Sequence, residues 1–139
     1  MRVRLIAAGT RLPGWVNEGY SEYAKRLTGI RLELVEVPPR RSMLRLITPR
    51  EFVVALEVAG RAMDTVELSR WLEARLMAGR DLAFVIGGPD GHAAELLERA
   101  DFRWSLSPLT WPHGLVRVMV VEQLYRAQSI LKGHPYHRA

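Results

Sequence analysis

Short apolar runs that stop abruptly, often at glycine or proline, constrain the fold of this chain more than any other feature. Between these apolar runs lie segments whose apolar residues are spaced as in a helix. An apolar run buried on both faces is typical of a parallel sheet. Because strand and helix patterns alternate along the whole chain, the sequence predicts an α/β fold, a mostly parallel sheet flanked by helices, in one domain, 1–139. The expected strands are 3–8, 32–37, 52–56, 82–86 and 104–107.

Four segments have the pattern of helices. In the first, Trp15 belongs to the apolar side that is expected to face the sheet. Asp64 and Glu67 have the spacing of a capping box at the start of the second, and Gly79 is expected to end it. The expected helices span 13–27, 64–78, 93–100 and 115–131.

The connection between the second and third expected strands is unusually short. Only 13 residues, 38–50, separate Val37 from Glu51, and they include four arginines. A crossover between parallel strands needs about a dozen residues or more, usually with a helix. Two explanations are open: the chain has a clipped version of a longer crossover, or a segment near Ser42 is missing from the sequence.

Charge and cysteine content narrow the possible functions. A formal net charge of +5 and a pI of about 10.2 favour an anionic partner, because clustered Lys and Arg gain affinity for phosphates by releasing counterions. Charge alone also fits a basic domain without such a partner. The lack of cysteine excludes disulfides and thiolate metal sites and favours a cytoplasmic location. The start of the chain is expected to be a strand and not a signal peptide, and a soluble protein is expected because no apolar run is long enough to span a membrane.

A glycine-rich turn, 87–91, follows the most strand-like run. In open α/β sheets ligands bind beyond the carboxyl ends of the strands, and Gly87 and Gly88 allow close approach of the backbone. A tight turn before a helix explains the same residues, and both interpretations stay open. The turn lacks the GxGxxG and P-loop patterns, so dinucleotide oxidoreduction and nucleotide hydrolysis lose support. The histidines lack metal-ligand spacing, so no metal is expected.

Polar residues near the C-terminus form a second candidate site. Glu122 and Arg126 lie at i, i+4 and are able to pair, either as an ion pair at a subunit interface or with Arg126 as a substrate contact. The last six residues, 134–139, combine two histidines, a tyrosine and an arginine, which transfer protons and bind anions. The last expected helix is apolar on nearly every side from 115 to 121, which favours burial on one face by a second copy of the chain.

Four segments together resemble the RlmH family of SPOUT-class methyltransferases: LIAAGT, IGGPDG, WSLSPLTWPHGLVRVMVVEQLYRA and HPYHR. The similarity covers almost the whole chain and is densest from 84 to 138. It implies an enzyme that methylates N3 of a pseudouridine in 23S ribosomal RNA, on the assembled ribosome, with S-adenosyl-L-methionine as methyl donor. It also implies a homodimer and a C-terminal trefoil knot, an exception to the rule that chains do not thread loops.

The resemblance assigns roles motif by motif. The helix and tail motifs give the expected catalytic residues, which are Glu122, Arg126, Tyr136, His137 and Arg138. The chain departs from the family in two ways: the usual basic helix in the crossover is largely missing, and Pro108 and Trp111 stand where smaller or aliphatic residues are common. The donor-binding residues are expected to be Leu56, Gly87, Leu106, Ser107, Pro108, Leu109, Thr110 and Trp111.

Methylation of N3 requires removal of its proton. His137 or Tyr136 is expected to act as the base, with Arg138 or Arg126 stabilising the anion, and His113 is a further candidate. A six-residue tail does not easily return to its own distant loops, so we expect it to complete the donor pocket of the partner subunit. The competing interpretations are a non-catalytic basic RNA-binding protein of the same fold and an unrelated nucleotide-binding domain.

Overall fold

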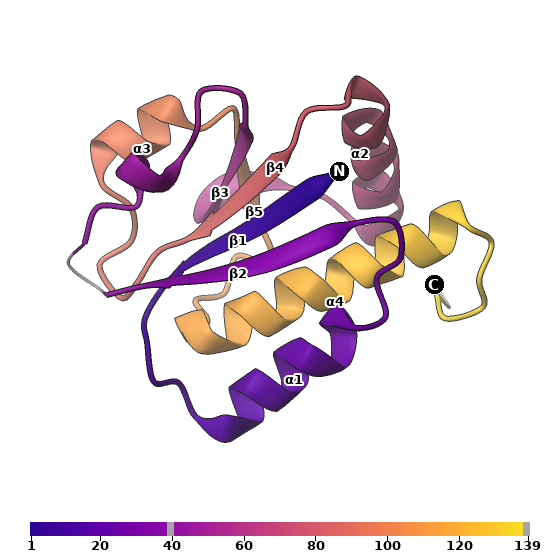
Figure 1. Cartoon of the computed structure of the whole chain (residues 1–139), viewed down its shortest axis with the longest axis horizontal. Helices are drawn as coiled ribbons and strands as arrows, with labels where there is room; N and C mark the ends of the chain where they lie inside the picture. The colour runs from indigo at the N-terminus through magenta and orange to yellow at the C-terminus, as the bar shows by residue number, and fades with distance from the viewer. Residues whose placement is uncertain (39–40, 138–139) are drawn as a thin grey trace.

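A five-stranded parallel sheet forms the centre of the molecule (Figure 1). The computed structural model describes residues 1–38 and 41–137. The strand order is β2-β1-β4-β3-β5, and each neighbouring pair is parallel, as the alternating pattern predicted. The elements are, in chain order, β1 (Arg2–Ala8), α1 (Gly14–Ala24), β2 (Arg31–Val37), the 3₁₀ turn η1 (Leu44–Leu46), β3 (Phe52–Ala62), α2 (Thr65–Ala78), β4 (Leu82–Ile86), α3 (Ala94–Arg99), β5 (Phe102–Ser105) and α4 (His113–Leu131).

Helices cover both faces of the sheet, which explains the continuous apolar runs of β1 and β4. On one face α1, α2 and α4 pack against the sheet, with Phe84 and Leu124 fully buried in the larger core. On the other face α3 and η1 pack over a smaller core that contains Ile6 and Leu96. The three-layer α/β fold is therefore confirmed, while the trefoil knot stays a prediction.

The expected Asp64 cap at the start of α2 and the expected Gly79 stop at its end are confirmed. Asp64 accepts a hydrogen bond from the Glu67 backbone N–H at 2.7 Å, and Gly79 ends the helix in the left-handed region with φ 78°. These contacts satisfy backbone groups that a helix end otherwise leaves unpaired.

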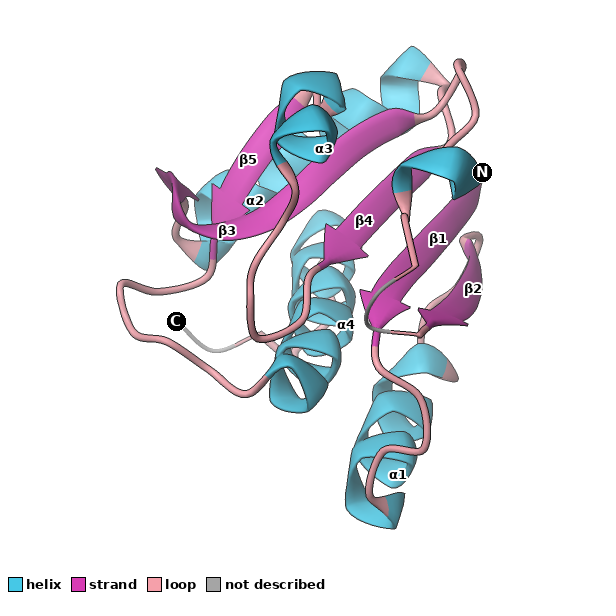
Figure 2. Cartoon of the chain, turned by 90° about the vertical axis from the view of Figure 1, so that its left-hand side faces the viewer, coloured by secondary structure: helices cyan, strands magenta, loops and turns pink. Residues whose placement is uncertain are grey.

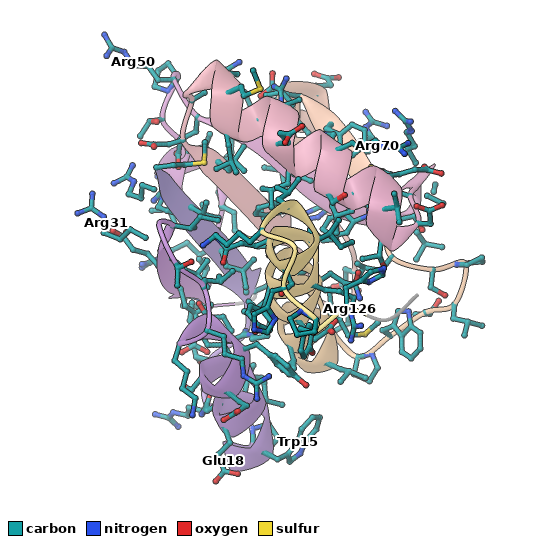
Figure 3. The ribbon with its side chains drawn as sticks, turned by 90° about the vertical axis from the view of Figure 1, so that its right-hand side faces the viewer. Trp15, Glu18, Arg31, Arg50, Arg70 and Arg126 are labelled. Atoms are coloured by element: carbon teal, nitrogen blue, oxygen red, sulfur yellow. The ribbon has the colours of Figure 1, made fainter. Side chains whose placement is uncertain are left out.

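Two strand boundaries and one side chain differ from the sequence-based expectation. Strand β3 continues to Ala62, six residues beyond the expected end, and β5 begins and ends two residues early. Trp15 is 59% exposed and does not face the sheet. It lies in the first turn of α1, at the end of the helix that projects from the body of the molecule (Figure 3).

The described residues of the short crossover, 38 and 41–50, pack on the sheet without a full helix. The side chains of η1 contact the smaller core. Glu51, at the end of the crossover, is 1% exposed and accepts hydrogen bonds from Arg4 and from the Thr48 backbone. Burial alone would raise the pKa of Glu51, but the bonds from Arg4 and Thr48 outweigh it and lower the pKa. The crossover is therefore anchored by a buried ion pair.

Helix α4 is covered mainly by its own chain. Val118 packs where α1 approaches at Gly19, and α2 lies along the other side. Arg117, within the apolar stretch, is fully buried and donates to the Glu36 carboxylate at 2.8 Å. These contacts account for part of the apolar surface that the sequence assigned to a second copy. No described helix is long and apolar enough to cross a membrane.

Candidate active site

The main cavity lies beyond the carboxyl ends of β3, β4 and β5. Its volume is about 780 Å³. In Figure 2 the loops that follow β4 and β5 curve toward the start of α4, and Val116 of that helix closes one wall. Seven of the eight expected donor-binding residues line the cavity, and Pro108 does not: the seven are Leu56, Gly87, Leu106, Ser107, Leu109, Thr110 and Trp111.

The glycine turn after β4 leaves no space for a side chain at its first position. A Cβ atom at Gly87 would lie 2.9 Å from the Gly91 carbonyl oxygen and 3.2 Å from Nδ1 of His92. Gly91 has φ 74° and its N–H donates to the Gly88 carbonyl at 3.0 Å, which closes the turn. Glycine is therefore required at 87 by close approach and at 91 by its backbone conformation.

His92 joins the glycine turn to the end of β3. Its Nε2 lies 3.0 Å from the carbonyl oxygen of Leu56. Burial lowers the pKa of His92. The backbone of Leu56, the Glu57 carboxylate and the backbone of Val85 act in the opposite direction because they favour the charged form, but burial outweighs them. From the sequence, His92 was assigned no role and was only excluded as a metal ligand. The signal available was its place directly after the turn.

The loop after β5 is held by its own serines. Ser105 Oγ donates to the Ser107 carbonyl, and Ser107 Oγ accepts from the Leu109 backbone N–H, both at 3.0 Å. Leu109 is 62% exposed at the rim of the cavity. The indole N–H of Trp111 is buried without a hydrogen-bond partner among the described residues. This loop therefore lines the cavity mainly with apolar side chains and contributes one N–H without a hydrogen-bond partner in the described part of the chain, that of Trp111.

Three of the expected catalytic residues, Glu122, Arg126 and Tyr136, form a second cluster beside α4. Arg126 binds the Glu122 carboxylate at 2.6 and 2.8 Å, and the Tyr136 hydroxyl donates to the same carboxylate at 3.0 Å. The Arg126 guanidinium lies 4.7 Å from the centre of the Tyr136 ring, and that ring packs against Tyr125. His137 has a buried Nδ1 with no partner among the described residues. Arg138 lies outside the described residues, as does the side chain of His113.

Within one chain the cavity and the tail cluster are separate. No residue of the described tail, 132–137, lines the cavity. Glu122 and Arg126 follow Val116 by six and ten residues, about 9 and 15 Å along the helix at 1.5 Å per residue. The glycine turn and the loop after β5 thus meet around one cavity, and the tail of the same chain packs further along α4.

Known proteins share this sequence and fold. A family model described as "Predicted SPOUT methyltransferase" matches residues 1–137. The chain belongs to the SPOUT methyltransferase family. Among its curated relatives, proteins named "Ribosomal RNA large subunit methyltransferase H" are 55% identical in Alkalilimnicola ehrlichii, over the full length of both chains, and 48% identical in Hahella chejuensis, over 99% of both.

Solved structures with low sequence identity share the fold of this chain. A probable methylase family protein from Haemophilus influenzae Rd KW20 has a TM-score of 0.65 at 13% identity, covering 99% of this chain and 70% of that one. A probable methyltransferase from Bordetella pertussis Tohama I has a TM-score of 0.64 at 14% identity, covering 91% and 95%. These two comparisons support the fold alone.

The curated relatives are longer than this SPOUT chain. The alignment with the Alkalilimnicola protein has 156 positions against 139 residues here, so 17 of its positions fall opposite gaps in this chain. Both explanations of the short crossover, a clipped connection or a missing segment, predict such a difference.

The cavity has features that fit the methyl donor of SPOUT enzymes. Close backbone approach at Gly87, the unmet Trp111 indole N–H and an apolar rim suit a flat heterocycle with polar edges. Two carboxylates, Glu57 and Asp90, also line the cavity and favour a cationic ligand.

Proposed function

We propose that this protein transfers a methyl group from S-adenosyl-L-methionine to N3 of a pseudouridine in 23S ribosomal RNA. Family membership gives the class of enzyme, and the names of the full-length relatives support a large-subunit ribosomal RNA substrate. The observation that carries the proposal is the single cavity lined by seven of the eight positions that the family motifs assign to the donor.

The residues of the cavity would hold the donor by shape and by backbone groups. When bound, the donor supplies an electrophilic methyl group on a sulfonium. Leu56, Gly87 and the loop 106–111 form the walls, and the apolar rim excludes water from the reacting atoms. The carboxylates of Glu57 and Asp90 favour the positive charge that the donor carries. Positioning in such a pocket lowers the entropic cost of the reaction.

The tail cluster bears on the choice of base. Partial burial, with the Glu122 carboxylate beside it, raises the pKa of Tyr136 to about 12. The phenol therefore keeps its proton at neutral pH and donates a hydrogen bond to the Glu122 carboxylate. Among the described candidates we assign proton removal from N3 to His137, and anion stabilisation to Arg126.

We propose that the enzyme is a homodimer in which the tail of one subunit completes the donor pocket of the other. The separation of cavity and tail cluster within one chain supports this arrangement. The expected setting is the cytoplasm, and the expected partner is an assembled ribosome or its large subunit, in line with the names of the full-length relatives. The positive charge fits that partner. We infer that the 17 positions lacking here fall in the crossover, where the family has basic residues.

Two measurements test the proposed function. Calorimetry with S-adenosyl-L-methionine should give saturable binding, and ATP and NAD should give none. Methylation of assembled ribosomes, compared with naked RNA and with ribosomes that lack the pseudouridine, should place the product at N3 of that base. Donor binding without methylation of any of these substrates would favour the alternative, a non-catalytic RNA-binding protein of the same fold. Absence of donor binding would overturn the proposal.

Tyr136→Phe tests the role of the tail. Loss of the hydroxyl removes the bond to Glu122, so we expect methyl transfer to fall at least about tenfold with unchanged donor affinity, since a hydrogen bond to a charged group contributes about 1.5–3 kcal/mol. His137→Ala should fall further if that residue removes the proton, because general-base catalysis contributes about 10²–10⁴-fold. Equal rates in Tyr136→Phe and the unmodified enzyme would rule out the bond to Glu122 as a requirement.

A further inference from the structure

His92 makes the contact that extends the β3–β4 pairing by one residue. The register of β3 with β4 ends at Ala55 opposite Val85. The next carbonyl of β3, that of Leu56, is 3.0 Å from His92 Nε2. His92 belongs to the loop after β4, so its side chain takes the place of a further backbone contact between the two strand ends.

The Leu56 carbonyl is where β3 leaves the sheet to form the rim of the cavity. Leu56 pairs with Trp104 of β5, and Arg61 pairs with the same residue, so the four residues between them bulge outward. Three residues of this bulge, Glu57, Val58 and Ala59, line the cavity. A bond that fixes the Leu56 carbonyl therefore fixes the start of the bulge.

The same imidazole also packs against the glycine turn. A carbonyl oxygen only accepts, so Nε2 carries the proton, and Nδ1 of the neutral ring is an acceptor. Nδ1 is buried, has no hydrogen-bond partner among the described residues, and lies 3.2 Å from the place of a Cβ at Gly87. The ring thus touches both walls of the cavity, the bulge of β3 and the turn after β4.

We propose that His92 is a positioning residue that fastens the β3 bulge to the glycine turn and so sets the shape of the methyl-donor pocket. The inference rests on the proposed function, because it concerns the same cavity. His92 itself lines the cavity, and the proposed role runs through its contacts with Leu56 and Gly87. Its loss should therefore weaken donor binding and raise the KM for the donor more than it lowers kcat.

A matched pair of amide variants tests this assignment. In His92→Gln the side-chain N–H₂ reaches the position of Nε2, and in His92→Asn it reaches only that of Nδ1. Calorimetry with S-adenosyl-L-methionine should give about tenfold weaker binding for His92→Asn, the upper range for one lost hydrogen bond. His92→Gln should recover most of that loss. Equal affinities of His92→Asn and the unmodified protein, or equal losses in both variants, would overturn the role of His92.

The unmodified protein provides an independent test if a variant fails to fold. Nitrogen NMR of the histidine rings should find His92 as the Nε2–H tautomer, with an exchangeable proton that becomes more protected when S-adenosyl-L-methionine is added. An Nδ1–H tautomer, or a ring proton whose exchange the donor leaves unaltered, would contradict the proposal. If the unmodified protein does not bind the donor at all, the proposed function fails. If it binds and His92→Asn binds equally, only this inference fails.

Discussion

In the glycine turn, Gly87 and Gly88 differ in whether they have space for an added methyl group. At Gly87 the new Cβ would lie 2.9 Å from the Gly91 carbonyl oxygen, and the nearest atom is backbone. At Gly88 the nearest atom is Ala8 Cβ at 3.5 Å, an ordinary contact. We expect Gly87→Ala to lower the free energy of unfolding by about 1–3 kcal/mol, the usual cost of overpacking, and Gly88→Ala by much less.

Urea denaturation of the two variants, each with its own midpoint and slope, measures this difference. Donor affinity should follow the same order, because the turn forms one wall of the cavity. A Gly87→Ala protein as stable as Gly88→Ala would mean that the turn can open to admit a side chain.

His92 should make stability depend on pH just below neutrality. Burial lowers its pKa in the folded state, below the value of about 6.5 expected in the unfolded chain. The unfolded chain then binds the proton more readily, so the contribution of the neutral ring is complete above pH 6.5 and is lost as the pH falls through the lower, folded pKa. The Glu57 carboxylate opposes this shift, and burial outweighs it.

The melting temperature at pH 7.5 and 5.5 tests this linkage. It should fall more on acidification in the unmodified protein than in His92→Gln, which cannot titrate in this range. An identical fall in both proteins would assign the pH dependence to other groups.

At the residue scale the sequence predicted the lining of the cavity better than its internal contacts. Motif resemblance placed Leu56, Gly87 and the loop 106–111 in one site, and the structure brings seven of these eight residues around one cavity. His92 was missed because its bond to a carbonyl 36 residues earlier depends on where two loops meet. Neither residue spacing nor periodicity encodes that meeting point.

At the scale of elements, one buried ion pair joins α4 to the sheet. Arg117 is fully buried, while its partner Glu36 on β2 has a side chain that is 35% exposed. The other contact of the guanidinium is the Gly9 carbonyl at 3.5 Å, and Nε has no partner among the described residues. The two charges are therefore unequal in their access to water.

This inequality predicts which single substitution costs more. Glu36→Ala leaves an uncompensated buried guanidinium and should lower the free energy of unfolding by about 3–5 kcal/mol. Arg117→Met leaves a carboxylate that water can reach, so its cost should be smaller. Urea denaturation of both single variants and of the double variant separates the free energy of the Arg117–Glu36 ion pair from the cost of burying each charge alone. A larger loss in Arg117→Met would show that packing of the long side chain, and not its charge, holds α4 in place.

Strand ends were less predictable than strands. The runs at β1 and β4 were recognised because both faces are buried, which leaves a continuous apolar signal. The second half of β3 is half-exposed or exposed and includes the bulge against Trp104, so its sequence lacks that signal. β5 begins two residues early because Phe102 pairs with Val54, a contact that local periodicity does not report.

At the scale of the whole molecule, the tail packs on α4 and near Arg26, just after α1, in its own chain. The Arg26 guanidinium lies 5.2 Å from the Tyr23 ring and 5.9 Å from the Tyr136 ring, and Tyr136 bonds to Glu122. The tail is therefore placed beyond the donor cavity along α4. In the proposed homodimer we expect the α4 helices of the two copies to lie close together, so that the tail of one reaches the cavity of the other.

A heterodimer of two defective subunits tests this arrangement. One subunit lacks residues 134–139 and keeps its cavity, and the other carries Gly87→Ala and keeps its tail. If the tail acts on the partner's cavity, the purified heterodimer should regain about half the activity of the unmodified dimer, because one of its two sites is complete. Each defective homodimer is the control, and its low residual activity sets the baseline for the heterodimer. If the tail acts on its own cavity, no site in the heterodimer is complete, and the mixture should stay as inactive as the controls.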